Sequence, residues 1–161
     1  MRILGIDPVV HGGLAVVSFP DPKGGRKILI DAIDIPVVGL KAKERVDVSS
    51  LIRWVKDCAV DYAVIERAQA MPAQGASSGF KYGRATGAIE AAVECMCIPV
   101  TIIEASAWKK FHNLLGHRNE KEPSRQRALE IFRGAEQLAR KKDHGRAEAA
   151  LMAIYYYATA L

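Results

Sequence analysis

The chain has 161 residues, of which 50% are hydrophobic and 25% are charged, a composition that is ordinary for a soluble globular protein. One domain with a substantial core is expected at this length. No apolar run is long enough to cross a bilayer and no signal peptide is recognised, so membrane-spanning and secreted classes are disfavoured. Cys58, Cys95 and Cys97 suit neither a disulfide framework nor a zinc set, and we expect buried thiols in a reducing compartment.

The net charge of +5 is unevenly distributed along the chain. Residues 1–100 hold 12 basic and 11 acidic side chains, whereas residues 101–146 hold 11 basic and 6 acidic ones. A basic segment of this kind favours a polyanionic partner such as nucleic acid, although a basic face also serves solubility alone.

The N-terminal part is predicted to begin with three strands, over residues 2–7, 12–19 and 27–35. A loop over residues 36–47, a helix over 48–60 and a fourth strand over 61–66 follow. Pro8 cannot continue a central ladder, so the first strand is predicted to stop just after Asp7. Tight connections between the first three strands predict an antiparallel meander. The fourth strand again ends on a carboxylate, that of Glu66.

Residues 77–96 have the pattern of a long helix with small residues at every fourth position, namely Gly79, Gly83, Gly87 and Ala91. Each glycine costs a helix about 1 kcal/mol relative to alanine, so this small-residue stripe requires a close contact. Three partners remain open: the rest of the monomer, a second subunit, or nucleic acid.

The remaining chain is predicted to form a fifth strand and three helices, over residues 98–103, 105–115, 123–140 and 143 onwards. The expected fold class is therefore α/β, with a five-stranded mixed sheet flanked by helices in a single domain over residues 1–161.

Two predicted strands each end in an acid, Asp7 and Glu66. If these strands are parallel neighbours, the two carboxylates lie at the same sheet edge, where α/β folds place their sites. Asp143 and Glu148 open the last predicted helix, where an N-cap and a first-turn acid are the structural alternative. His144 is open between a helix-start residue without function, a metal neighbour and a proton shuttle.

Crowded carboxylates repel one another and raise each other's pKa values unless a hard cation lies between them. Two Mg²⁺ ions about 4 Å apart can activate a water molecule and stabilise the leaving oxygen in phosphodiester hydrolysis. The chain contains no phosphate-binding loop, nucleophile elbow or zinc-protease motif that would indicate another chemistry.

The chain resembles the RuvC-like Holliday junction resolvases of the ribonuclease H-like superfamily. The resemblance rests on the order of four segments: Gly5-Ile6-Asp7-Pro8, Ala63-Val64-Ile65-Glu66, the Gly83-x-x-x-Gly87 helix, and Asp143 followed by Glu148-Ala149-Ala150-Leu151. The segments around Glu66 and Glu148 look most similar to the plant organellar resolvases and their bacterial relatives. Bacterial RuvC ends with two ligands three positions apart, whereas Asp143 and Glu148 are five apart, so Asp143 and His144 both remain candidates for the third ligand.

The resemblance implies a homodimeric endonuclease that resolves four-way (Holliday) DNA junctions with Mg²⁺ or Mn²⁺, two ions per site. By position, it implies that the catalytic and metal-binding acids are Asp7, Glu66, Asp143 and Glu148. Phosphate contacts are expected from the start of the long helix and from the basic segment, at Ser77, Ser78, Lys81, Lys109, Lys110, Lys121 and Arg125. Trp108, beside Lys109, is predicted to belong to the core.

Two alternatives are another ribonuclease H-like nuclease, acting on RNA–DNA hybrids or general DNA, and a non-catalytic nucleic-acid-binding module. The complete set of acids argues against the second alternative. A cytoplasmic bacterial or phage protein is expected, with an organellar protein that has lost its transit peptide as the alternative.

Overall fold

The computed structural model describes residues 1–20, 25–40, 43–69, 75–116 and 122–160. Its strands are β1 (Arg2–Ile6), β2 (Gly13–Ser18), β3 (Ile28–Asp34), β4 (Val37–Val38), β5 (Arg45–Val46), β6 (Tyr62–Glu66) and β7 (Val100–Ile103). Its α-helices are α1 (Val48–Asp57), α2 (Ala76–Glu94), α3 (Ala105–Phe111), α4 (Glu122–Ile131) and α5 (His144–Ala160), and the short 3-10 helices η2 (Glu136–Leu138) and η3 (Lys141–Asp143) precede α5. Within these ranges, no helix combines the length and apolar character of a membrane span.

The main sheet has five strands in the order β3-β2-β1-β6-β7. Strands β1, β2 and β3 pair antiparallel, and β1, β6 and β7 pair parallel. The predicted meander and the predicted parallel pairing of the first and fourth strands are therefore confirmed. In that parallel pair Ile6 lies opposite Ile65, so Asp7 and Glu66 follow at the same edge of the sheet.

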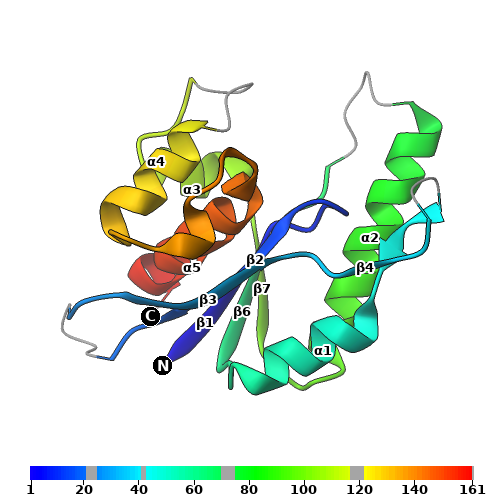
Figure 1. Cartoon of the computed structure of the whole chain (residues 1–161), viewed down its shortest axis with the longest axis horizontal. Coiled ribbons are helices and arrows are strands. Elements are labelled where there is room, and N and C mark those ends of the chain that lie inside the picture. The colour runs from blue at the N-terminus through cyan, green and yellow to red at the C-terminus, as the bar shows by residue number, and fades with distance from the viewer. Residues whose placement is uncertain (21–24, 41–42, 70–74, 117–121, 161) are drawn as a thin grey trace.

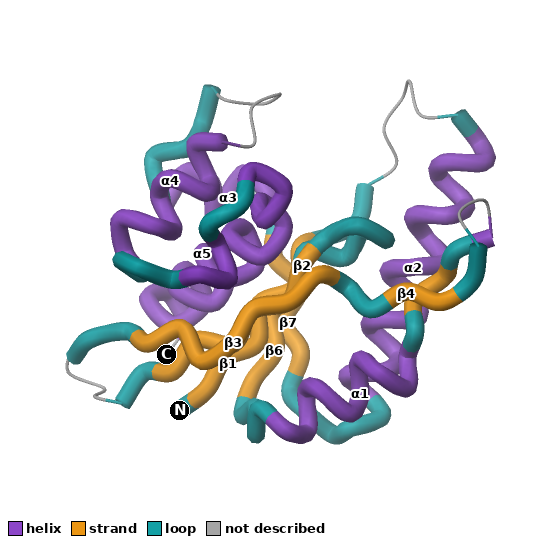
Figure 2. The backbone as a smooth tube through the Cα atoms, in the orientation of Figure 1, coloured by secondary structure: helices purple, strands orange, loops and turns teal. Residues whose placement is uncertain are grey.

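Helices cover both faces of the sheet, with α3, α4 and α5 on one side and α1 and α2 on the other (Figures 1 and 2). A separate apolar cluster fills each interface. Alternate residues of β1 supply the two clusters, because Ile3 belongs to the first and Leu4 to the second, as strand geometry requires. Helix α5 is buried on most of its sides, which explains why apolar residues surround its axis instead of forming one stripe.

Helix α5 approaches β1 and β2 at backbone distance. A Cβ added to Gly5 would lie 1.8 Å from the carbonyl oxygen of Ala149, and one added to Gly13 would lie 2.3 Å from the amide nitrogen of Arg146. Both positions therefore require glycine, because any side chain would push α5 off the sheet. This close contact determines how near the start of α5 lies to the strand ends.

Three local predictions are wrong. Residues 36–47 contain the β4–β5 hairpin, in which Val37 pairs with Val46. The helix predicted over residues 123–140 ends at Ile131, and the chain turns at Gly134, which has φ +79°. Cys58 is buried as expected, but Cys95 and Cys97 are exposed because they follow the end of α2.

The small-residue stripe of α2 has no close partner among the described residues. Apart from the backbone of α2 itself, none of their atoms lies within 4 Å of a Cβ built on Gly79, Gly83 or Gly87, and the adjacent Phe80 is 70% exposed. The close packing within the monomer that was one interpretation of the stripe is therefore not made by the described part of the chain, toward which α2 does not turn these glycines.

Candidate active site

Asp7 lies at the centre of the candidate site because β1 is the middle strand of the sheet. The turn after β1 is held by hydrogen bonds from the Asp7 N–H to the Gly13 carbonyl, 2.9 Å, and from the Gly12 N–H to the Val9 carbonyl, 2.8 Å. The Asp7 Oδ2 atom lies only 3.1 Å from a Cβ built on Gly145. The absence of a side chain at Gly145 therefore leaves room for the Asp7 carboxylate against the first turn of α5.

Glu66 ends β6 and accepts a hydrogen bond of 2.7 Å from Nε1 of Trp108. Burial raises the pKa of the Glu66 carboxyl, the Trp108 hydrogen bond opposes this shift, and the negative charge of Glu148 adds to it. The raised pKa of Glu66 thus results from loss of water and from the charges of two nearby acids, Glu148 and Glu104.

Glu148 comes from the opposite end of the chain. It lies one turn after Gly145 on α5, so it is carried to the same sheet edge as Asp7 by the close packing of α5 on β1. Its Oε1 atom accepts a hydrogen bond of 3.0 Å from the hydroxyl of Ser124, a buried residue of α4. Asp7, Glu66 and Glu148 therefore gather at one edge of the sheet, as the sequence predicted for its strand-end acids.

Tyr82 faces this edge from α2, in the opposite helical layer. Burial, followed by the charges of Glu66 and Asp7, raises the pKa of Tyr82 to about 12. One turn along α2, the hydroxyl of Thr86 lies 3.1 Å from the Tyr82 carbonyl and 3.3 Å from the Pro8 carbonyl, which places α2 beside the turn after β1. The phenol is thus a protonated neighbour of two acids at neutral pH.

Asp143 has different surroundings from the other three acids. Its side chain is 0% exposed, and its Oδ1 atom accepts from Nη2 of Arg140 at 2.7 Å and lies 3.7 Å from Nη1 of Arg146. Burial alone would raise the pKa of Asp143, but the hydrogen bonds from Arg140 and the charge of Arg146 lower it. Two arginines therefore hold Asp143 at the turn that leads into α5.

His144 is the first residue of α5 and precedes Gly145, the residue that contacts Asp7. Among the described residues, no group of three or more His, Cys, Asp and Glu side chains is close enough together to hold a metal ion. The donor chemistry nevertheless fits a hard divalent cation, because Glu148 is close enough for its charge to raise the pKa of Glu66 and Asp7 borders the same edge.

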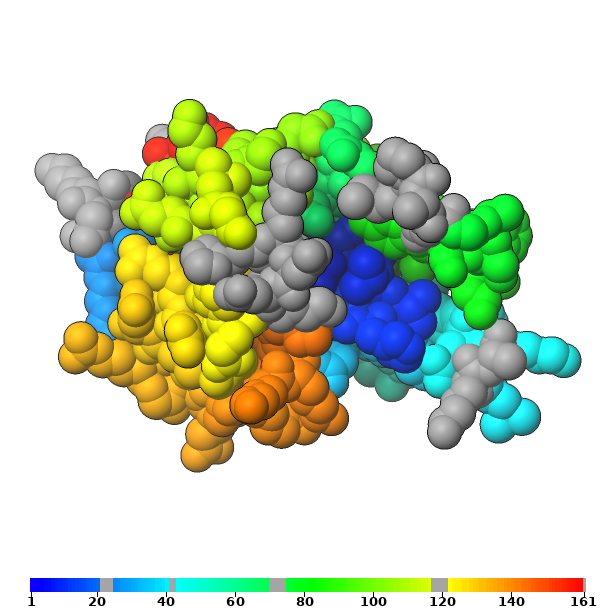
Figure 3. Space-filling model, turned by 90° about the horizontal axis from the view of Figure 1, so that it is seen from above, coloured from blue at the N-terminus to red at the C-terminus, as the bar shows by residue number. Residues whose placement is uncertain are grey.

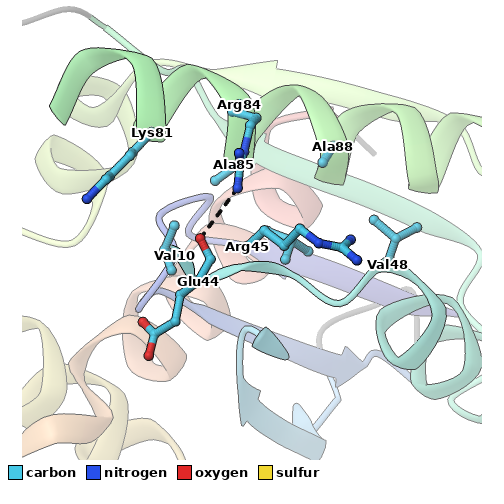
Figure 4. Close-up of a pocket in the computed structure, with 9 residues that line it drawn as sticks. Val10, Glu44, Arg45, Val48, Lys81, Arg84, Ala85 and Ala88 are labelled. Atoms are coloured by element: carbon cyan, nitrogen blue, oxygen red, sulfur yellow. Dashed lines mark hydrogen bonds between the residues drawn. The ribbon is translucent and has the colours of Figure 1, made fainter. Parts of the chain in front are cut away.

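The strand-end turn is accessible on the face shown in Figure 3, where the early residues of the chain lie between the region of α4 and that of α2. Ser77, Ser78 and Lys81 are exposed in the first turns of α2. Lys81 also lines a cleft of about 280 Å³ between α2 and the β5 hairpin, together with Arg45 and Arg84. In Figure 4, Arg84 reaches across this cleft to the Glu44 carbonyl, 3.5 Å away.

The other predicted DNA contacts lie on the α3 and α4 side. Lys110 is exposed, whereas Lys109 is half-buried with its Nζ atom 5.1 Å from the centre of the Trp108 ring. The guanidinium of Arg125 bonds Glu122 and the carbonyls of Leu138 and Ala139, so these contacts bind α4 to η2. Lys121 lies outside the described residues.

Sequence reasoning missed the site roles of Trp108, Ser124 and Tyr82. Trp108 is in the core as predicted, with 0% exposure, but its indole N–H points to Glu66. The positions of Ser124 and Tyr82 in the sequence do not predict that they lie near the acids, because tertiary packing brings both side chains there.

The sequence matches no model of a known protein family and no curated protein. Its structure, however, superposes on that of Thermus thermophilus RuvC in complex with a Holliday junction substrate, with a TM-score of 0.72 and 16% identity over 99% of this chain and 97% of RuvC. The chain has the RuvC fold. A second Thermus thermophilus RuvC structure gives a TM-score of 0.70 at 20% identity, over 97% of this chain and 95% of RuvC.

The RuvC fold is also shared with the yeast mitochondrial Holliday junction resolvase Ydc2. The TM-score is 0.61 at 12% identity, over 96% of this chain and 77% of Ydc2. The α/β fold class and the RuvC-like architecture expected from the sequence are therefore confirmed.

Proposed function

We propose that this protein is a metal-dependent endonuclease that resolves four-way DNA junctions. The observation that carries the proposal is the placement of Asp7, Glu66 and Glu148 at the same carboxyl-terminal edge of the central strands, in a chain with the RuvC fold. One similar structure, that of Thermus thermophilus RuvC, contains a Holliday junction substrate, which is the basis for the choice of DNA structure.

Asp7, Glu66 and Glu148 would hold the divalent ions, Mg²⁺ or Mn²⁺ and two per site. Bound there, the ions would lower the pKa of a water molecule, so that it could lose a proton and become a nucleophile toward phosphorus, and would supply positive charge for the leaving oxygen. The chain's own contribution is to orient the acids, through Trp108 for Glu66 and Ser124 for Glu148. Tyr82, protonated and next to two acids, would donate a hydrogen bond to a phosphate oxygen of the substrate.

A further ligand, besides Asp7, Glu66 and Glu148, is assigned to Asp143 or His144. The similarity of the segment from Asp143 to Ala149 to the plant organellar resolvases supports Asp143. Asp143 would have to exchange the Arg140 contact for the ion, since its oxygens bond that arginine. His144 begins the turn of α5 beside Asp7.

The proposal includes a homodimer joined through α2. The outward small-residue stripe and the exposed Phe80 form a surface on which a second helix would pack closely, and a two-fold symmetric junction requires two sites. Phe80→Glu should shift the protein from dimer to monomer in sedimentation at micromolar concentration. A wild-type monomer under those conditions would remove the dimer from the proposal.

Cleavage of a mobile four-way junction, compared with linear duplex and an RNA–DNA hybrid, tests the function. We expect paired nicks in the junction with Mg²⁺ or Mn²⁺, and none with a chelator. Asp7→Asn should retain junction binding and lose cleavage by orders of magnitude. Equal cleavage of hybrid and junction would indicate a different ribonuclease H-like nuclease, and full activity of Asp7→Asn would reject the site.

A further inference from the structure

Trp108 is a fully buried tryptophan whose indole N–H meets a candidate metal ligand. Its side chain is 0% exposed, and its Nε1 atom donates to Oε2 of Glu66 at 2.7 Å. A glutamate side chain has three rotatable bonds, so this hydrogen bond fixes one oxygen and with it the plane of the carboxylate. We propose that Trp108 is a positioning residue that orients the Glu66 carboxylate for divalent metal, an inference that rests on the proposed function.

The donor to Glu66 is neutral, and this distinguishes it from the donors to Asp143. Arg140 and Arg146 compensate the charge of Asp143, whereas an indole N–H orients Glu66 and leaves its negative charge in place. An arginine at position 108 would compete with a cation for the same carboxylate. A neutral donor is the chemistry expected where a carboxylate must stay charged for a metal ion.

One further contact agrees with this role. Glu148 shows the same arrangement as Glu66, because the buried Ser124 supplies another neutral donor, at 3.0 Å, to Oε1. Each of the two acids thus has one oxygen held by a neutral group from the α3–α4 side.

The chain contains its own control for the removal of an indole–carboxylate bond. Trp54 donates through Nε1 to Oδ2 of Asp31 at 2.8 Å, and it lies on α1, in the layer away from Glu148. Trp108→Phe and Trp54→Phe therefore remove the same chemical interaction, one at the site and one outside it. A third variant carries 3-benzothienylalanine at position 108, which keeps the shape of tryptophan but replaces the N–H with sulfur. This variant removes the hydrogen bond while the packing of the side chain is retained.

Mn²⁺ binding is measured by the electron paramagnetic resonance signal of the free ion, without DNA, and cleavage is measured under single turnover. We expect the position-108 variants to weaken Mn²⁺ binding and to slow cleavage by about 10- to 100-fold, with junction affinity in Ca²⁺ unchanged. Trp54→Phe should match wild type in all three measurements. Thermal unfolding shows whether each variant is folded.

The proposal is overturned if the benzothienylalanine variant binds Mn²⁺ as wild type does, or if Trp54→Phe weakens binding equally. Failure of the proposed function gives a different result, because a wild-type protein that binds Mn²⁺ but does not cut junctions still permits the binding comparison. A wild-type protein that binds no Mn²⁺ overturns the inference directly.

Discussion

Replacement of Gly5 by alanine tests whether the packing of α5 on β1 determines the site. The new Cβ would lie 1.8 Å from the Ala149 carbonyl oxygen, whereas real Cβ contacts under 3.0 Å essentially never occur. One of the two backbones must therefore move by about 1 Å, which is the scale of misplacement that slows an enzyme about 100-fold. Glu148 is adjacent to Ala149, so the movement of α5 displaces a candidate ligand.

The expected loss of stability follows from the same contact. Overpacking costs about 1–3 kcal/mol, and the upper end is expected because both contacting groups are backbone. For a domain of this size, about 3 kcal/mol lowers the melting temperature by roughly 6–12 °C. Differential scanning calorimetry measures the loss of stability. Junction cleavage, at a temperature where the variant is folded, measures the loss of activity.

Gly79→Ala is the matched control, because outside the backbone of α2 no atom of the described residues lies within 4 Å of the Cβ that it would add. Its melting temperature should not fall by a comparable amount, since alanine favours a helix over glycine by about 1 kcal/mol. If Gly5→Ala has the wild-type melting temperature and cleavage rate, α5 does not pack at backbone distance and another cause must position Glu148.

The remaining predictions concern charge. Because the pKa of Glu66 is raised from 4.5 in the folded protein, the stability of the metal-free protein should fall as the pH rises from 4.5 to the pKa of the folded state. The Glu66→Gln variant should show no such fall. Melting temperatures of the two proteins that change in parallel across this pH range would contradict the raised pKa of Glu66. Asp143→Asn should lower the free energy of unfolding by about 3 kcal/mol, measured with a denaturant, because it leaves two arginines without their buried charged partner. Glu148→Gln should lower it only a little. Equal losses in the two variants would show that the Arg140 contact is not stabilising. Lys109→Ala should reduce the salt slope of junction binding by about 0.9, and an unchanged slope would place Lys109 outside the interface.

Much of the fold could be predicted because its strongest signals are local. The short β-branched strands, Pro8 after Asp7 and the turn residues between strands predicted the meander and the parallel neighbour. The β4–β5 hairpin was missed because two-residue strands carry no periodicity. The end of α4 was missed because the turn depends on the positive φ of Gly134, which a helical pattern on both sides obscures.

The candidate site was predictable only in part, for a related reason. Asp7 and Glu66 could be placed together because strand pairing relates their positions. The contacts of Asp143 with Arg140 and Arg146, and the donors to Glu66 and Glu148, depend on how helices from the other end of the chain pack. No pattern along the sequence specifies those neighbours, so the sequence did not predict that two arginines hold Asp143 apart from the other three acids. The roles of the acids remain predictions.

The middle strand and the helix that lies on it come from opposite ends of the chain. During translation at about 5–20 residues per second, Asp7 emerges roughly 7–30 s before Glu148. Once β7 has emerged, the nascent chain has all the strands of the sheet but lacks the helix that covers one of its apolar faces. Until α5 packs there, chaperones have an exposed apolar surface to bind, and one of the acids of the proposed site is absent.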